Sequence, residues 1–235
     1  MRIAMWSGPR NLSTAMMYSF AQRPDCTVID EPFYAAYLAE TGVSHPMGAA
    51  ILASQPQDPD DVITNLEQYT GHAIRYEKHM THHILPGWNM DWLADVHNVF
   101  LIRHPARVIA SYAAKRENPT ADDLGFRQQF ELFQRVKALG QRPIIIDSFD
   151  VRADPKQALT KLCQALIIPF QDSMLTWKPG GDPADGVWAA HWYGAVHQSS
   201  GFAQAEGELP KLSGTLATLC SAVDEFYEPL VALKI

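Results

Sequence analysis

The stretch MRIAMWSGPRNLSTAMMYSFAQR, residues 1–23, decides the fold. The apolar run Arg2–Trp6 predicts a strand, and the apolar spacing of Leu12–Gln22 predicts a helix. Gly8 and Pro9 predict a sharp turn between them. Proteins hold phosphate where a strand leads through a tight loop into a helix, because the first amides of the helix point at the anion. The loop has no Lys before its Ser13-Thr14 pair, so it differs from loops that bind ATP or GTP.

The same alternation of short apolar runs and helical patterns continues along the chain. Alternating strands and helices predict a parallel sheet with helices on both faces, so the fold class is α/β with three layers and about five strands. No repeat or change in composition divides the chain, and we expect one domain over residues 1–235. Further strands are predicted at Thr27–Ile29, Ala73–Tyr76, Asn98–Ile102 and Pro143–Ile146, and further helices at Met90–Ala94, Pro105–Lys115, Ala121–Leu139, Pro155–Leu166 and Ser213–Leu233.

Composition and charge narrow the classes of partner. Hydrophobic residues make up 47% of the 235 residues, and the net charge of −7 is unsuited to a protein that binds nucleic acid without regard to its sequence. The three cysteines have no metal-ligand spacing and predict the reduced thiols of a cytoplasmic protein. The sequence shows no signal peptide and no run of membrane-spanning length. We expect no nucleic-acid or membrane partner, and a homodimer is left open.

Polar residues follow the predicted strands at their carboxyl ends, which is the edge where open α/β sheets bind ligands. If the strands are parallel, these residues meet although they lie far apart in the sequence. They are Ser7–Arg10, Asp30 and Glu31, Glu77–His79, Arg103 and His104, and Asp147.

A second candidate phosphate-binding motif is RHPARVIASY, residues 103–112. Arg103 ends a predicted strand, Pro105 favours the start of a helix, and Ser111 follows about two helical turns later. A guanidinium and a hydroxyl so placed can grip one phosphate. Two alternatives stay open at this point: Arg103 pairs with a carboxylate such as Asp147, and the first loop only starts a capped helix.

Together the two motifs resemble the nucleotide-binding segments of sulfotransferases that use 3′-phosphoadenosine 5′-phosphosulfate (PAPS). In that family a Pro-Lys/Arg-x-x-Ser/Thr-Thr loop holds the 5′-phosphosulfate, and an Arg at a strand end with a Ser eight residues later holds the 3′-phosphate. The resemblance implies a fold similar to that of the P-loop nucleoside-triphosphate hydrolases. It assigns the first role to Pro9, Arg10, Asn11, Leu12, Ser13 and Thr14 and the second to Arg103 and Ser111.

Further segments are similar to a narrower sulfotransferase-like group of bacteria, whose domain also occurs in plants beside an aminotransferase-like one. The likeness spans Met1 to about Phe202, although the Arg-Lys-Gly clamp of the cytosolic enzymes is missing. A C-terminal segment folds over the nucleotide in the family, which implies contacts from Ser199 and Ser200. The similar segments are DEPFYAAYL (30–38), ALTKLC (158–163), IPFQDSMLTW (168–177) and GVWAAHWYGAVHQSSGF (186–202).

Glu31 is the candidate for the base that takes the acceptor's proton in sulfuryl transfer. The resemblance implies this role, because some sulfotransferases have a Glu in about this place. Lys78 is the candidate cation for the departing phosphate oxygen. His79 is the alternative base, since its segment is similar to the Lys-Thr-His segment of cytosolic sulfotransferases. A zinc site at His79, His82 and His83 lacks a fourth ligand, so no metal is expected.

Three functions remain in competition. The leading one is a sulfotransferase that uses PAPS as co-substrate and acts on a hydroxyl or amine of a small acceptor. A small-molecule kinase would need a loop Lys, with Asp30 or Asp147 as the Mg²⁺ ligand. The third is a non-catalytic nucleotide- or anion-binding module. We expect the acceptor pocket in the variable loops Tyr34–Asp61 and Gly87–Asp91 and in the aromatic tail, residues 187–202.

Overall fold

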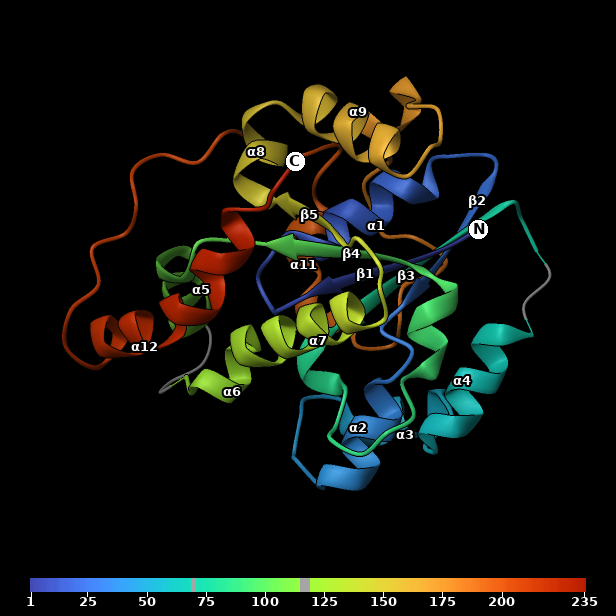
Figure 1. Ribbon diagram of the computed structural model, residues 1–235, viewed down its shortest axis with the longest axis horizontal. Coiled ribbons are helices and arrows are strands. Elements are labelled where there is room, and N and C mark those ends of the chain that lie inside the picture. The colour runs from blue at the N-terminus through green and yellow to red at the C-terminus, as the bar shows by residue number, and fades with distance from the viewer. Residues whose placement is uncertain (69–70, 115–118) are drawn as a thin grey trace.

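A computed structural model describes residues 1–68, 71–114 and 119–235. In this part of the chain, five parallel strands form one sheet in the order β2-β3-β1-β4-β5 (Figure 1). This confirms the predicted sheet. The strands are β1 (Arg2–Ser7), β2 (Cys26–Asp30), β3 (Ile74–Met80), β4 (His97–Ile102) and β5 (Ile144–Asp147).

Helices cover both faces of the sheet, which confirms the three layers (Figure 1). On one face α1 (Ser13–Ala21), α8 (Ser148–Ala153) and α9 (Pro155–Ala165) pack over apolar side chains of the strands. On the other face lie α4 (Pro59–Glu67), α7 (Phe126–Ala138) and α12 (Gly214–Val231). The short helix α5 (Pro105–Ala113) follows β4.

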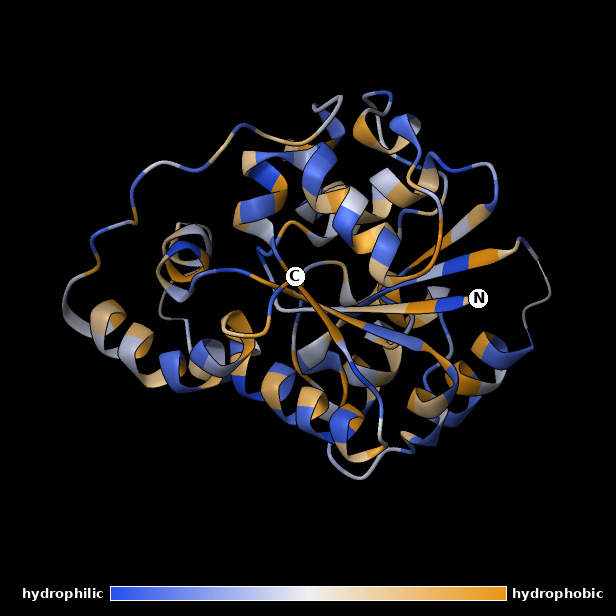
Figure 2. Cartoon of the chain, turned by 45° about the horizontal axis from the view of Figure 1, so that its top comes forward, coloured by the Kyte–Doolittle hydropathy of each residue, from blue (hydrophilic) through white to orange (hydrophobic). Residues whose placement is uncertain are grey.

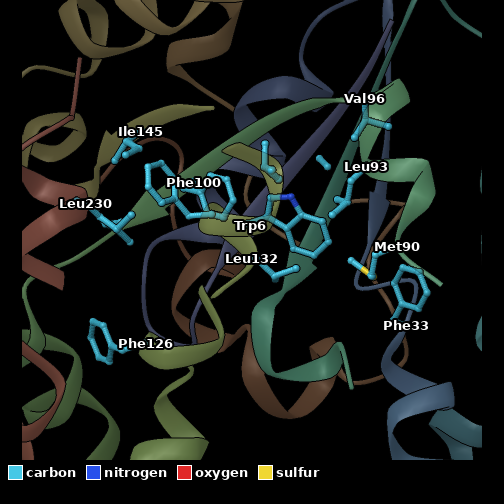
Figure 3. Close-up of a cluster of buried hydrophobic side chains, with 14 of the residues drawn as sticks. Trp6, Phe33, Met90, Leu93, Val96, Phe100, Phe126, Leu132, Ile145 and Leu230 are labelled. Carbon is cyan, nitrogen blue, oxygen red and sulfur yellow. The ribbon is translucent and has the colours of Figure 1, made fainter. Parts of the chain in front are cut away.

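The larger core cluster lies between the sheet and α7 (Figure 3). Trp6 and Phe100 enter it from neighbouring strands, and Leu132 of α7 and Leu230 of α12 close it from the other side. Figure 2 shows apolar residues along the central strands and polar residues over much of the outer helix surface. The short apolar runs of the sequence thus form strands that are buried on both faces of the sheet, and the spacing of apolar residues in the helices selects the side of each helix that is buried.

Three predicted elements differ from the structure. The helix predicted over Ala121–Leu139 is divided into α6 (Ala121–Leu124) and α7, because Gly125 between them has a φ of 72°. The strand predicted to end at Tyr76 continues to Met80 as β3. The helix predicted at 90–94 is a 3₁₀ turn, η2 (Asp91–Asp95). The end predicted for α5 at Lys115 lies outside the described residues.

The segment predicted as a loop over Tyr34–Asp61 is mostly helical. It contains α2 (Tyr34–Thr41), α3 (Gly48–Ser54) and the start of α4. The apolar sides of α2 and α3 form a small cluster with the aromatic tail, where the short helices α10 (Ala189–Trp192) and α11 (Gly194–His197) lie. Single turns at η1 (Thr81–His83) and η3 (Asp172–Leu175) complete the described elements. Such short helices depend on tertiary packing, so the sequence pattern gave no sign of them.

The cysteines are free thiols, as predicted: Cys26 and Cys163 are buried and Cys220 is half-buried. Burial raises the pKa of the Cys26 thiol to about 12. None of the helices in the described ranges is both long and apolar enough to span a bilayer.

Candidate active site

The loop between β1 and α1 packs closely against the end of α6. A Cβ on Gly8 would lie 2.5 Å from the carbonyl oxygen of Leu124, so only glycine fits there. Arg10 and Leu12 take left-handed backbone angles, with φ of 64° and 72°. No side chain caps α1 at Leu12, which leaves the amides of its first turn available to an anion. The structure thus gives no support to the alternative in which Ser13 and Thr14 serve only as caps.

The two predicted phosphate-binding motifs meet in space although 101 residues separate Arg10 from Ser111. Arg10 Nε donates to Ser111 Oγ at 2.9 Å, and Arg103 Nη1 donates to the Arg10 carbonyl oxygen at 2.6 Å. Burial and the nearby Arg103 charge lower the pKa of Arg10. Arg103 does not pair with Asp147, because Asp147 caps α8 and contacts Lys234. The carboxylate partner of Arg103 is Glu206.

A cavity of about 470 Å³ lies at this carboxyl edge of the sheet. Most of the predicted site residues line it, whereas His79 and Ser200 do not. The sequence did not single out Arg152 as a site residue, and it contributes to the wall. Tyr34, from the predicted acceptor segment 34–61, also lines this cavity. The predicted residues in the lining are Pro9, Arg10, Asn11, Leu12, Ser13, Thr14, Glu31, Lys78, Arg103, Ser111 and Ser199.

Lys78 joins the two carboxylates that follow β2. Its ammonium donates to Asp30 Oδ1 at 2.8 Å, forms a short contact with Glu31 Oε1 and donates to Tyr193 Oη at 2.7 Å. Tyr193 in turn donates to Asp30 at 2.9 Å and accepts from the Trp188 indole at 3.0 Å. Glu31 has a φ of 40°, and its amide donates to the Lys78 carbonyl oxygen, so the backbone turns sharply here.

In this buried group the two carboxylates of Asp30 and Glu31 share the single Lys78 ammonium. This ratio decides which of the three groups is charged. Burial raises the pKa of Glu31; Lys78 opposes the rise and the Asp30 charge adds to it. Burial works against the charged form of Lys78, but Asp30 and Glu31 outweigh it and raise the pKa of the ammonium. Lys78 therefore stays charged, while Glu31 is the carboxylate that takes up a proton more readily than usual.

His79 lies on the opposite face of the sheet from Lys78, because successive strand residues alternate. Its ring stacks on Trp6 at 4.4 Å, and its Nε2 donates to Glu77 at 3.2 Å. Arg2 and Arg75 also bind the Glu77 carboxylate, each through Nε at 2.8 Å. The predicted strand-end position of Glu77–His79 is wrong: β3 runs through it, and the ion cluster satisfies the buried charges.

The two histidines of η1 are closer to the cavity than His79. His83 Nδ1 is 3.9 Å from Glu31 Oε2, and its ring stacks on Tyr34 at 4.3 Å. Burial lowers the pKa of His82 to about 4, and burial also lowers the pKa of His83 well below its ordinary value. Both imidazoles are therefore neutral at pH 7. No group of three or more His, Cys, Asp or Glu side chains placed to hold a metal was found within residues 1–68, 71–114 and 119–235.

An arginine cluster that the sequence did not reveal borders the cavity. The Glu206 carboxylate contacts Arg103, Arg107 at 3.1 Å and Arg152 at 2.6 Å. Arg152 lies in α8, directly after β5. Ligands bind at the carboxyl ends of parallel strands, so the residues that follow β5 could have been considered as site residues together with Asp147. Glu206 lies in a segment with no periodic pattern and could not have been found in this way.

A second cavity of about 600 Å³ adjoins the first. The two cavities share His45, His82, Tyr112 and Asp123 in their walls. Residues of the two predicted acceptor loops line the second cavity, including Tyr37 and Trp88. The aromatic tail, the third predicted acceptor segment, lines the first cavity instead, with Trp192 and Tyr193 in its wall. The opposite wall of the second cavity comes from α6 and α7, which the sequence analysis had not assigned to a site. The charged residues of that wall are Asp122, Asp123, Arg127, Glu131 and Arg135.

Comparisons with known proteins identify the family. A family model described as a sulfotransferase domain matches residues 1–233. The chain belongs to the sulfotransferase domain family. This confirms the resemblance seen in the two phosphate-binding motifs.

Curated relatives of this sulfotransferase-family chain are found in a plant. The branched-chain-amino-acid aminotransferase-like protein 1 of Arabidopsis thaliana is 38% identical over 201 residues, which cover 85% of this chain and 36% of that protein. The corresponding protein 2 is 37% identical over 206 residues, 87% of this chain and 36% of that protein. The chain thus spans 36% of the length of these relatives.

Solved structures share the fold. The sulfotransferase domain of the Synechococcus PCC 7002 olefin synthase has a TM-score of 0.57 at 18% identity, covering 97% of this chain and 94% of that one. The sulfotransferase domain from the curacin biosynthetic pathway has a TM-score of 0.52 at 14% identity, covering 96% of each chain.

Proposed function

We propose that the protein is a sulfotransferase that moves a sulfuryl group from PAPS to a hydroxyl or amine of a small acceptor. The observation that carries this proposal is the meeting of Arg10 with Ser111 and Arg103 at one cavity, with the Glu31 carboxylate in the same wall. Two phosphate grips and a carboxylate base around one cavity are the parts that sulfuryl transfer from a doubly phosphorylated nucleotide requires.

In this proposal the loop and the start of α1 hold the 5′-phosphosulfate. The uncapped amides of α1 donate to its oxygens, and the positive end of the helix favours negative charge there. The permanently charged Arg10 adds a cation. Arg103, with Ser111, reads the 3′-phosphate of the nucleotide.

Sulfuryl transfer then runs between the two cavities. The acceptor oxygen or nitrogen attacks sulfur, the bond from sulfur to the phosphate oxygen breaks, and adenosine 3′,5′-bisphosphate leaves. Glu31 takes the proton from the acceptor. The α1 amides and Arg10 stabilise the charge on the departing phosphate oxygen. Lys78 already points its donors at Asp30, Glu31 and Tyr193, so we propose that its main effect is to hold and tune Glu31.

The second cavity is the proposed place for the acceptor. It opens beside the Glu31 cavity through shared residues His45, His82 and Tyr112. Its wall combines aromatic rings such as Tyr37 and Trp88 with charged groups of α6 and α7. An acceptor with an apolar or aromatic body and a polar substituent suits such a lining.

The contacts of the candidate Mg²⁺ ligands give no support to the kinase alternative. Asp30 is paired with Lys78 and accepts from Tyr193, and its second oxygen accepts from the Gly186 amide at 3.1 Å. Asp147 caps α8 and does not line the cavity. Neither carboxylate is placed as a kinase would need it for Mg²⁺.

A thermal-shift comparison tests the proposal, because a compound that binds the native state raises the melting temperature by mass action. We expect adenosine 3′,5′-bisphosphate to raise the melting temperature, and ATP with Mg²⁺ and GTP with Mg²⁺ to have much smaller effects. A screen with labelled PAPS against hydroxylated and amine acceptors then detects transfer directly. A larger stabilisation by ATP with Mg²⁺ would replace this proposal with the kinase.

A further inference from the structure

Glu206 has a buried side chain in the middle of an otherwise exposed segment. Residues 203–209, which we call the strap, connect the aromatic tail to α12 and run around the outside of the molecule at the carboxyl edge of the sheet (Figure 1). All strap residues except Glu206 are exposed. The Glu206 side chain is 2% exposed, because it reaches inward to the arginine cluster of Arg103, Arg107 and Arg152.

The strap is tied to the body through the same arginines. Besides the three ion pairs of Glu206, Arg152 Nε donates to the Gln204 carbonyl oxygen at 2.8 Å, and Arg107 makes a short hydrogen bond to the Gly207 carbonyl oxygen. Among the described residues, no other hydrogen bond was found from the strap to the rest of the protein. These three arginines therefore provide the polar attachments of the strap to the rest of the protein.

The arginine cluster has more positive charge than its carboxylate partner. Three guanidinium groups face the single Glu206 carboxylate, and Arg10 lies close enough for Arg103 to lower its pKa. Arg103 Nε is buried and donates to no acceptor among the described residues. Such an excess in a chain of net charge −7 suits an anion with more charge and more oxygens than one carboxylate has.

The cluster also differs from a purely structural ion pair in its position. Arg103 and Arg152 line the 470 Å³ cavity together with the loop between β1 and α1, and Arg103 donates to the Arg10 carbonyl oxygen. A phosphate group held by the arginine cluster and an anion held by the loop between β1 and α1 would therefore lie in the same cavity. The Glu206 carboxylate resembles part of a phosphate group, because it carries a negative charge and two acceptor oxygens.

We infer that Glu206 stands in for the ribose phosphate of the nucleotide and that the strap is a built-in competitor for that site. The arginine cluster is the site that a dianionic phosphate takes, with Arg107 and Arg152 as further phosphate-binding residues. The inference rests on the proposed function, which supplies the nucleotide. Binding then requires Glu206 to leave, so the apparent affinity is reduced by the fraction of molecules in which the strap is closed.

Binding measurements on two strap variants test this inference. Glu206→Gln keeps the shape of the side chain and removes the competing charge, so adenosine 3′,5′-bisphosphate should bind about ten-fold more tightly than to wild type, roughly 1.4 kcal/mol. Glu208→Gln makes the same chemical change on an exposed strap residue and should leave the affinity unchanged. Adenosine 5′-phosphate, without a ribose phosphate, should bind both variants as it binds wild type. Unchanged or weaker binding of the bisphosphate to Glu206→Gln overturns the inference.

A second measurement does not depend on a variant that folds. Cleavage after Glu206 by a glutamate-specific protease in the wild-type chain should speed up when adenosine 3′,5′-bisphosphate is added, because the arginines release the Glu206 side chain, which is 2% exposed while it is paired. Slower or unchanged cleavage after Glu206 at saturation contradicts the strap's role as competitor.

Inorganic phosphate separates this inference from the proposed function. If neither wild type nor Glu206→Gln binds the nucleotide, the proposed function fails. The strap is then judged by inorganic phosphate alone, which should bind Glu206→Gln more tightly than wild type and Glu208→Gln. Equal binding of phosphate to all three chains overturns the strap proposal as well.

Discussion

Glu77 and Glu31 are both buried carboxylates beside cations, yet their pKa values move in opposite directions. Glu77 lies within β3, on the face opposite to Lys78, and contacts Arg2, Arg75 and His79. Although burial opposes its ionisation, hydrogen bonds and charges from His79 and Arg2 hold the pKa of Glu77 at about 2. Burial raises the pKa of Glu31 in spite of Lys78.

The difference comes from the number of cations for each carboxylate. Arg2 and Arg75 both pair with Glu77, whereas Glu31 shares the single Lys78 ammonium with Asp30. A fully compensated carboxylate stays ionised and holds the fold, and a partly compensated one can take up and release a proton. We propose that this contrast separates structural from catalytic carboxylates in this protein, and the following predictions test it.

The largest expected effect is on turnover at Glu31. Glu31→Gln keeps the shape and hydrogen bonding of the side chain but removes the proposed base. Turnover with PAPS and a verified acceptor should fall by roughly 10²–10⁴-fold, as for the loss of a general base. Affinity for adenosine 3′,5′-bisphosphate should stay near wild type. Steady-state kinetics and calorimetric binding measure the two quantities separately.

His79→Gln is the matched control for that experiment. His79 is packed on Trp6 and does not line the cavity, so the folded variant should keep most of its turnover. Loss of turnover in His79→Gln with retention in Glu31→Gln would reverse the assignment of the base.

At Glu77 the expected effect is on stability. Glu77→Gln leaves the buried guanidinium of Arg75 and the partly exposed Arg2 without their carboxylate. Loss of one partner of a buried pair costs about 3–5 kcal/mol of unfolding free energy, so the melting temperature should fall by roughly 10 °C. Turnover per folded molecule should change little. A turnover loss as large as that of Glu31→Gln would break the contrast between the two carboxylates.

The depressed pKa of Glu77 also sets a pH window for stability. Because the folded pKa of about 2 lies below the ordinary value of 4.5, the ionised carboxylate stabilises the fold above that ordinary value. This stabilisation is lost as the pH falls from about 4.5 towards 2. Glu77→Gln should therefore lose less stability than wild type over that interval in acid unfolding followed by circular dichroism.

Arg103 tests whether a paired arginine also serves a ligand. Like Arg75 it contacts a buried carboxylate, but it lines the cavity as well. Arg103→Ala should weaken binding of adenosine 3′,5′-bisphosphate by about ten- to hundred-fold, since a charge-assisted contact contributes roughly 1.5–3 kcal/mol. Adenosine 5′-phosphate should be affected much less. Lys156→Ala, which removes an exposed ion pair with Asp172, is the matched control. Equal losses for both nucleotides would make Arg103 a structural residue like Arg75.

The parts of the fold and site that the sequence predicted correctly depend on patterns within short stretches of the chain. The strand, loop and helix of residues 1–23 and the β4–α5 motif each lie within a short stretch, and parallel strands bring their ends together by topology alone. The convergence of the two motifs at one edge of the sheet was therefore predictable, whereas the particular contact of Arg10 with Ser111 was not predicted.

The errors arose where long-range contacts override local polarity. The Glu-Lys-His run at 77–79 resembles the end of a strand, but β3 continues because Arg2, 75 residues away from Glu77, compensates the buried charge. Glu206 pairs with Arg103 across 103 residues, from a segment without any pattern. The short helices α2 and α3 depend in the same way on packing against the aromatic tail.

The smallest expected effect concerns the tuning of Glu31 by Tyr193. The Tyr193 hydroxyl lies 3.2 Å from Glu31 Oε1, and this hydrogen bond lowers the pKa of Glu31 against the larger effect of burial. Tyr193→Phe removes the hydroxyl and should raise the pKa of Glu31 further. A general base must be ionised, so activity is present above the pKa of Glu31 and is lost as the pH falls through it. The acid limb of the pH profile of kcat/KM should thus begin above the ordinary 4.5 in wild type and move to still higher pH in Tyr193→Phe. Tyr18→Phe, which removes a hydroxyl bonded to Asp185 outside the Glu31 group, should leave the limb in place. A limb that moves to lower pH, or equally in both variants, would show that Glu31 is not the titrating base.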